Sequence, residues 1–86
     1  MARLNLTNPG IVTVDVHGMT AAEARKCIES KLKSSRGVYR IKVVHGYHGG
    51  TALRDMVRGQ LAKNPKVIRV EIGLNDGETD LILKEF

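Results

Sequence analysis

Two stretches decide how this chain of 86 residues is organised: Val14 to Met19 (Val-Asp-Val-His-Gly-Met) and His45 to Arg54 (His-Gly-Tyr-His-Gly-Gly-Thr-Ala-Leu-Arg). In each stretch an apolar, β-like run leads to a histidine and then a glycine. This pattern is typical of a strand that carries a polar side chain at its C-terminal end and then turns into a helix. Two such strand ends lying side by side would form a site.

Working outward from these stretches, the sequence predicts the order βαβαββ. Strands are expected over residues 11–16 and 39–45, joined by a helix that begins with a capping box at Thr20 and Glu23 and closes at Gly37. A second helix over 51–64 stops at Asn64-Pro65, and strands over 66–74 and 79–83 follow. The first two strands are joined through a helix and are therefore expected to be parallel, so that both histidines lie at one edge of the sheet.

Periodicity predicts which faces are buried. In the first strand Val12, Val14 and Val16 point one way, and Thr13, Asp15 and His17 point the other. The buried faces of the two helices are expected to consist of Ala21, Ala24, Cys27, Ile28 and Leu32, and of Leu53, Met56, Val57, Gln60 and Leu61.

Length and composition fit one domain over residues 11–86, preceded by a flexible arm over 1–10. The single cysteine excludes an internal disulfide framework, and neither a signal-peptide core nor a membrane span is found, so we expect a soluble, cytoplasmic monomer. The net charge of +5 favours a polyanionic partner, although the same charge would also keep a small protein soluble. Aromatic residues are too few for a sheet that stacks several bases.

Three strand-end side chains could carry chemistry. His17 and His45 could act as base and acid in phosphodiester cleavage, and Asp15 could fix the tautomer of His17 and raise its pKa. Each also has a structural explanation, as a surface, hydrogen-bonded or capping residue. The same three side chains could ligate a divalent metal, but their spacing is not diagnostic, and we expect no cofactor.

The glycine-rich stretch and nearby cations could hold a phosphate. Backbone N–H groups and a helix N-terminus suit an anion, and arginine adds a bidentate grip. The candidate binding residues are Gly46, Tyr47, His48, Gly49, Gly50, Thr51, Arg54, Lys42 and Arg58. The arginines could equally be a solvated helix face, and Tyr47 could simply cover the loop.

These two stretches resemble the Smr (small MutS-related) domain family, whose Leu-Asp-Leu-His-Gly pattern is similar to Val14 to Gly18. Arg36-Gly37, Ile41 to Gly46 and Leu53-Arg54 are similar to its second element. The resemblance implies an α+β two-layer sandwich with two helices on one face of a four-stranded mixed sheet, like the C-terminal domain of a bacterial translation initiation factor. It also implies nucleic-acid binding and, in several members, cleavage of RNA or nicking of DNA, with Asp15 and His17 as the catalytic element.

The sequence departs from the family pattern at two places. His48 stands where the loop usually has its second glycine, and the turn from Asp76 to Asp80 is acidic, so it would repel a nucleic-acid backbone if it bordered the cleft. We expect a stand-alone, bacterial-type member without the repair or ribosome-binding parts to which the domain is often fused, although association with the ribosome stays open.

An endonuclease that acts on RNA or DNA is the leading hypothesis. A non-catalytic nucleic-acid-binding module and a protein that binds a phosphorylated metabolite or a protein partner are the alternatives.

Overall fold

The computed structural model describes residues 10–46, 51–72 and 76–84. The elements are β1 (Ile11–Asp15), α1 (Ala21–Lys33), β2 (Arg40–Val44), α2 (Ala52–Asp55), the π-helical turn η1 (Met56–Gln60), the 3-10 turn η2 (Leu61–Lys63), β3 (Arg69–Glu71) and β4 (Glu78–Ile82). Because α2, η1 and η2 follow one another without a break, we call them together the second helix. The predicted order βαβαββ is confirmed.

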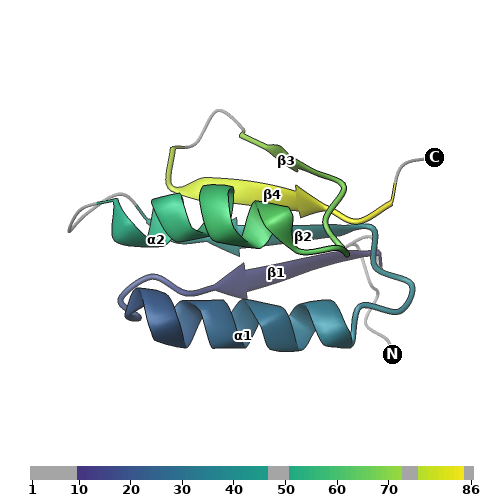
Figure 1. Cartoon of the computed structure of the whole chain (residues 1–86), viewed down its shortest axis with the longest axis horizontal. Coiled ribbons are helices and arrows are strands. Elements are labelled where there is room, and N and C mark those ends of the chain that lie inside the picture. Colours follow the sequence, from purple (N-terminus) through teal and green to yellow (C-terminus); the bar gives the residue numbers. More distant parts are fainter. Residues whose placement is uncertain (1–9, 47–50, 73–75, 85–86) are drawn as a thin grey trace, which may run out of the picture.

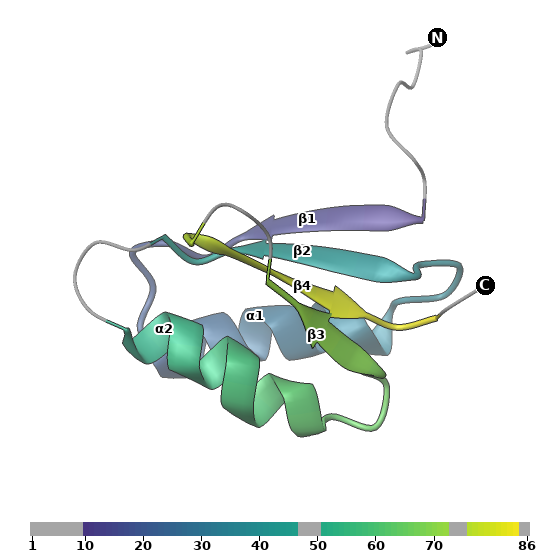
Figure 2. The same cartoon turned by 90° about the horizontal axis from the view of Figure 1, so that it is seen from above.

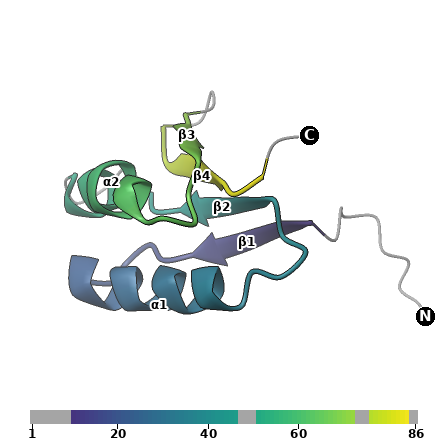
Figure 3. The ribbon, with the colours of Figure 1, turned by 45° about the vertical axis from the view of Figure 1, so that its right-hand side comes forward.

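The strands form one mixed sheet in the order β1-β2-β4-β3. β1 pairs with β2 in parallel, as the helical connection between them predicts, whereas β4 is antiparallel to both of its neighbours. Figure 2 shows both helices on the same face of the sheet, and among the described residues no helix covers the other face. α1 lies beneath β1, and the second helix lies beside β2 and β4 (Figures 1 and 3). The expected two-layer α+β sandwich is confirmed.

β1 has the two-sided character that its alternating sequence predicts. Val14 and Val16 are buried, whereas Thr13, Asp15 and His17 are exposed. The parallel ladder continues one step past the end of the strand, where the Val16 N–H donates to the Val44 carbonyl at 2.9 Å. Burial of the valines therefore sends the polar side chains at the end of β1 outward.

α1 begins at the predicted capping box. The Glu23 N–H donates to Thr20 Oγ1 at 3.1 Å, and the Thr20 N–H donates to Glu23 Oε1 at 3.0 Å. Of its predicted buried face, Ala24, Ile28 and Leu32 are buried, and Ala21 and Cys27 are partly buried and pack against the core. The helix ends at Lys33, earlier than expected, and Gly37 takes its left-handed conformation (φ 80°) in the turn toward β2.

The second helix buries Met56, Val57 and Leu61 as predicted, but the prediction for Gln60 is wrong. Gln60 is exposed, and its Oε1 accepts a hydrogen bond from Arg25 Nη1 at 3.1 Å. An amide at the edge of the buried face needs hydrogen-bond partners, and its exposed position supplies them. A π-helical turn spans Met56–Gln60. This turn contains Gly59, whose residue type has a low helix propensity.

The expected arm over residues 1–10 lies outside the described residues except for Gly10, whose carbonyl accepts the Tyr39 N–H at 2.8 Å. β3 is shorter than the predicted strand over 66–74, and residues 73–75 lie outside the described ranges. Within the described residues no helix is both long and apolar enough to cross a membrane.

Candidate active site

The two stretches in which a strand leads to a histidine and a glycine meet at one edge of the sheet. Asp15 is paired with Val44 in the parallel ladder, so His17 and His45 follow neighbouring strand ends. Gly46 adopts the left-handed conformation, with φ of 76°, and a Cβ built on it would lie 3.5 Å from His17 Cβ. The predicted convergence of the two motifs is confirmed.

Asp15 and His17 form a close pair on the solvent side of this edge. Asp15 Oδ1 lies 2.5 Å from His17 Nδ1 and also accepts the His17 backbone N–H at 3.1 Å. Since an ionised carboxylate can only accept, the ring proton sits on Nδ1. The side chains of Asp15 and His17 are 54% and 70% exposed, and Nε2 has no hydrogen-bond partner among the described residues. When the ring is neutral, the pair thus presents Nε2 to solvent as a proton acceptor.

The pair shifts both titrations. The hydrogen bond from His17 lowers the pKa of Asp15 below its usual 3.8, and the same bond raises the pKa of His17 above its usual 6.5. The contribution of Asp15 to stability is present above pH 3.8 and is lost as the pH falls through its lowered pKa. The contribution of His17 is complete below pH 6.5 and is lost as the pH rises through its raised pKa. From mildly acidic to neutral pH, Asp15 is therefore a carboxylate and His17 an imidazolium, and the two form a charged pair.

We expect the His17 imidazole to titrate above pH 6.5 and to return toward that value in Asp15→Asn, because the amide removes the charge that holds the proton. Proton NMR of the ring C–H signals as a function of pH measures both values. A matched variant, Thr13→Ala, lies on the same exposed face of β1 and should leave the titration unchanged. Equal pKa values of His17 in the wild type and in Asp15→Asn would contradict the pairing.

His45 has a different setting, since it is only 3% exposed. Its Nδ1 lies 2.9 Å from the Gly46 carbonyl, and its Nε2 lies 2.8 Å from Thr79 Oγ1. Because the carbonyl can only accept, Nδ1 carries the proton, and Nε2 accepts from the Thr79 hydroxyl. Thr79 Oγ1 in turn accepts the Arg58 Nε–H at 2.9 Å. Both ring nitrogens of His45 are thus bonded inside the protein, which favours a positioning role over the predicted acid–base role.

A pocket of about 600 Å³ lies at this edge, between the start of α1 and the start of the second helix. Its wall includes His17 and His45 together with mainly apolar neighbours, among them Met19, Val44 and Leu53. The pocket joins both motifs in one cavity, so a ligand in it would contact the exposed His17 and the backbone that follows β2.

The predicted phosphate-binding cations each have an acidic neighbour. Lys42 Nζ lies 3.8 Å from Glu78 Oε1, and Arg54 and Arg58 lie 3.8 and 3.7 Å from the two carboxylate oxygens of Asp76. The acidic turn therefore borders the predicted binding residues and compensates their charge. The Nη2 atom of Arg58 is buried and makes no hydrogen bond within the described part of the chain.

The comparisons with known proteins decide the family. The model of the Smr domain matches residues 14–79, which include both motifs and the buried Thr79. The chain belongs to the Smr domain family. Its fold is similar to the crystal structure of the Smr domain of Thermus thermophilus MutS2, with 28% sequence identity and a TM-score of 0.77 over 86% of this chain and 99% of that one. The comparison with curated proteins gave no match.

Smr domains are known for nucleic-acid binding and, in some members, for nuclease activity. In this Smr domain Tyr47, His48, Gly49 and Gly50 lie outside the described residues. Thr51 lies just before α2, where its hydroxyl donates to Asp55 Oδ2 at 3.0 Å. The residues 10–46, 51–72 and 76–84 contain no cluster of three His, Cys, Asp or Glu side chains that could hold a metal ion.

Thr79 is the site residue that sequence reasoning missed. It is fully buried in β4 and connects His45 to Arg58. One signal was available, because Thr79 alternates with Leu81 and therefore occupies a core position of the strand, where a polar side chain needs a partner.

We expect Asp76→Asn to strengthen phosphate binding, because Asp76 faces two arginines that a nucleic acid would otherwise use. Removing one competing carboxylate should lower the dissociation constant for an oligonucleotide about tenfold at low salt. Fluorescence anisotropy with a labelled oligonucleotide measures the effect. Asp55→Asn is the matched control, since Asp55 pairs with Arg54 but not with Arg58. An unchanged dissociation constant would show that these arginines do not contact the ligand.

Proposed function

We propose that this Smr domain binds nucleic acid and cleaves phosphodiester bonds, with Asp15 and His17 as the catalytic pair and RNA as the favoured substrate. The observation that carries the proposal is the orientation of His17. Asp15 holds its Nδ1–H, and Nε2 faces solvent at the sheet edge beside the pocket. This is the arrangement that a general base requires, because the carboxylate stabilises the imidazolium formed when Nε2 takes a proton.

RNA supplies its own nucleophile. In the proposed step, His17 Nε2 takes the proton from a 2′-hydroxyl, and that oxygen attacks the adjacent phosphorus. The bond to the 5′-oxygen breaks, and this oxygen takes a proton from solvent, leaving a 2′,3′-cyclic phosphate. His45 acts as a positioning residue, because its bonds to Gly46 and Thr79 hold the backbone that packs against His17.

Cations on the neighbouring elements would bind the charged phosphoryl group. Arg54 and Arg58 lie on the second helix, and Lys42 lies on the side of β2 opposite the buried Ile41 and Val43. None of the three is among the residues that line the pocket. Each would exchange a contact of 3.7–3.8 Å with Asp76 or Glu78 for a phosphate oxygen. Contacts of this length are weak, so the exchange costs little at the more exposed Lys42 and Arg54. At Arg58 it costs more, because its Nη2 is buried and its Nε–H donates to Thr79.

The same ion pairs also support a second candidate function, a nucleic-acid-binding module without catalytic activity. Cations that are already compensated would grip the reacting phosphate weakly, and His45 does not supply an exposed acid. In this case the Asp15–His17 pair would serve only to order the turn between β1 and α1.

One experiment separates these functions and tests the substrate. The purified domain is incubated with labelled single-stranded RNA, with the same RNA carrying one 2′-deoxy residue, and with supercoiled DNA, each with and without chelator. Binding is titrated in parallel at 50 and 200 mM salt. We expect RNA cleavage that persists with chelator and is absent at the 2′-deoxy position, together with salt-dependent binding. Binding without cleavage of any substrate would leave the binding module, and cleavage at the 2′-deoxy position would exclude attack by the 2′-oxygen.

A further inference from the structure

The basic side chains of this domain divide by whether they have an acidic partner. Every acidic side chain in the described ranges is already engaged: Glu23 in the capping box, Asp15 with His17, and the others with Arg25, Arg40, Lys42, Arg54, Arg58 or Arg69. The basic residues of the same ranges that make no such ion pair are Lys26, Lys31, Lys33, Arg36, Lys63, Lys66 and Lys84. The unpaired positive charge of the described ranges therefore lies on α1 and at or after the ends of α1, the second helix and β4.

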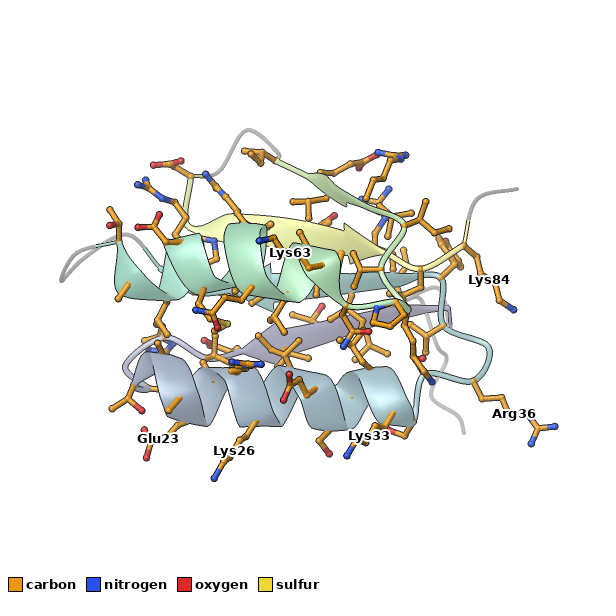
Figure 4. The ribbon with its side chains drawn as sticks, in the orientation of Figure 1. Glu23, Lys26, Lys33, Arg36, Lys63 and Lys84 are labelled. Carbon is orange, nitrogen blue, oxygen red and sulfur yellow. The ribbon has the colours of Figure 1, made fainter. Side chains whose placement is uncertain are left out.

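Most of these unpaired cations gather at the opposite end. α1 and the second helix both start near the pocket and run away from it, and β4 runs antiparallel to β2 and ends away from it as well. We define the distal basic surface as the cations at or after these ends that lie farthest from the pocket: Lys33, Arg36, Lys66 and Lys84. Lys33 and Lys66 border one hollow of about 400 Å³. Figure 4 shows Arg36 and Lys84 extending outward at the end where α1 stops.

The helix dipole explains only part of this charge. Lys33 lies in the last turn of α1, where a cation stabilises the negative end of the dipole. Arg36, Lys66 and Lys84 lie outside the helices, and this explanation does not apply to them. Their unpaired charges keep the molecule basic at one end, and such a region attracts a polyanion.

We propose that the distal basic surface holds the phosphate backbone of a nucleic-acid strand whose reacting phosphate lies at the other end, beside His17. This inference rests on the proposed function, because it assumes a nucleic-acid ligand. Lysine and arginine without internal partners suit backbone contacts, which position a strand without reading its sequence.

The length of the molecule sets the strand length needed. α1 contains 13 residues and is therefore about 20 Å long. Successive phosphates on one strand of a stacked, helical nucleic acid rise about 3.4 Å along the helix axis, so about six phosphates span this distance. A stacked strand of four nucleotides rises only about 10 Å and can occupy the pocket end without reaching the distal basic surface.

Other surfaces fit a nucleic-acid backbone less well. On the sheet face without helices, Arg40 bonds Asp80 and Glu71, Arg69 bonds Glu71, and Lys42 lies near Glu78. An acidic protein partner would require an apolar contact centre. Within the described ranges, the exposed large apolar residues are Ile68 and Ile72, on either side of β3. Ile68, whose N–H donates to the Ile82 carbonyl, lies at the distal end near Lys66 and Lys84, but a single apolar side chain does not form such a centre.

Two double variants with equal loss of charge test the proposal. Arg36→Gln/Lys84→Gln removes two distal cations, whereas the control Arg25→Gln/Arg69→Gln removes two cations that are already paired. Binding of a 20-nucleotide and a 4-nucleotide RNA is measured by fluorescence anisotropy from 50 to 200 mM salt. For the longer RNA, the distal variant should bind at least about tenfold more weakly at 50 mM. Its salt slope should fall by about 1.5, as expected for two lost phosphate contacts.

The control should lose much less affinity, and the 4-nucleotide RNA should bind the distal variant and the wild type equally. If the wild type binds the longer RNA and the two double variants bind it equally well, the surface assignment is overturned while the proposed function stands. An acidic protein would then be the better partner for the distal cations. If the wild type itself binds neither RNA, the proposed function fails, and this inference fails with it.

Discussion

Replacing His17 with alanine is expected to lower the rate of RNA cleavage about 10²- to 10⁴-fold, the range typical of a lost general base. The affinity for RNA should stay within about twofold, because the cations that contact phosphate lie on other elements. The protein should remain folded, since the His17 side chain is 70% exposed. Single-turnover cleavage of labelled RNA, together with an anisotropy titration, separates the two quantities.

Asp15→Asn tests the same pair through the pH profile. The base is active when His17 is unprotonated, so the rate falls as the pH drops through the raised pKa of His17. Removing the carboxylate lowers that pKa and should move the acid limb of the profile to lower pH, with a lower maximum rate. Thr13→Ala is the control on the same exposed face and should keep the wild-type profile. Full cleavage activity in His17→Ala would show that His17 is not the general base.

Thr79→Val is expected to destabilise the folded domain by about 2–4 kcal/mol, because it leaves two buried polar groups without partners. The Thr79 hydroxyl lies 2.8 Å from His45 Nε2 and accepts from Arg58 Nε at 2.9 Å, and Thr79 is fully buried. Valine has nearly the same shape, so the loss measures the hydrogen bonds rather than a cavity. Urea unfolding followed by circular dichroism measures the change in the free energy of unfolding.

Two further variants test whether the lost hydrogen bonds cause this destabilisation. Thr79→Ser keeps the hydroxyl and should recover most of the loss. Thr13→Val makes the same exchange at an exposed position of β1 and should change the free energy of unfolding by less than about 0.5 kcal/mol. If Thr79→Val proved as stable as Thr13→Val, the chain from Arg58 through Thr79 to His45 would contribute nothing to folding.

Local sequence patterns were sufficient wherever the partners are close in the chain. The alternation in β1 predicted that Val14 and Val16 are buried and that Asp15 and His17 are exposed. The capping box at Thr20 and Glu23 formed as predicted, because its two partners lie within one helical turn. The βαβ connection predicted the parallel pairing of β1 and β2, and this pairing brings the two motifs to one edge.

The prediction failed at Gln60. The 3.6-residue repeat places Gln60 on the same face as Met56 and Val57, yet Gln60 is exposed while the next residue, Leu61, is buried. The repeat assigns a face, but it does not tell which partner a polar side chain at the edge of that face finds. The bond from Arg25 to Gln60 joins the two helices over 35 positions of sequence, so no local pattern contains it.

The sequence by itself thus determined the family, the order of elements and the exposed Asp15–His17 pair, because these depend on periodicity and on neighbours within a few residues. The tertiary structure alone decided the environments of the other candidates. It buried His45 against Thr79, which lies 34 positions away, and it placed Asp76 beside Arg54 and Arg58. The physical reason is that the burial and charge of these residues depend on β4 entering the sheet beside β2, a long-range pairing that no single stretch of the chain encodes.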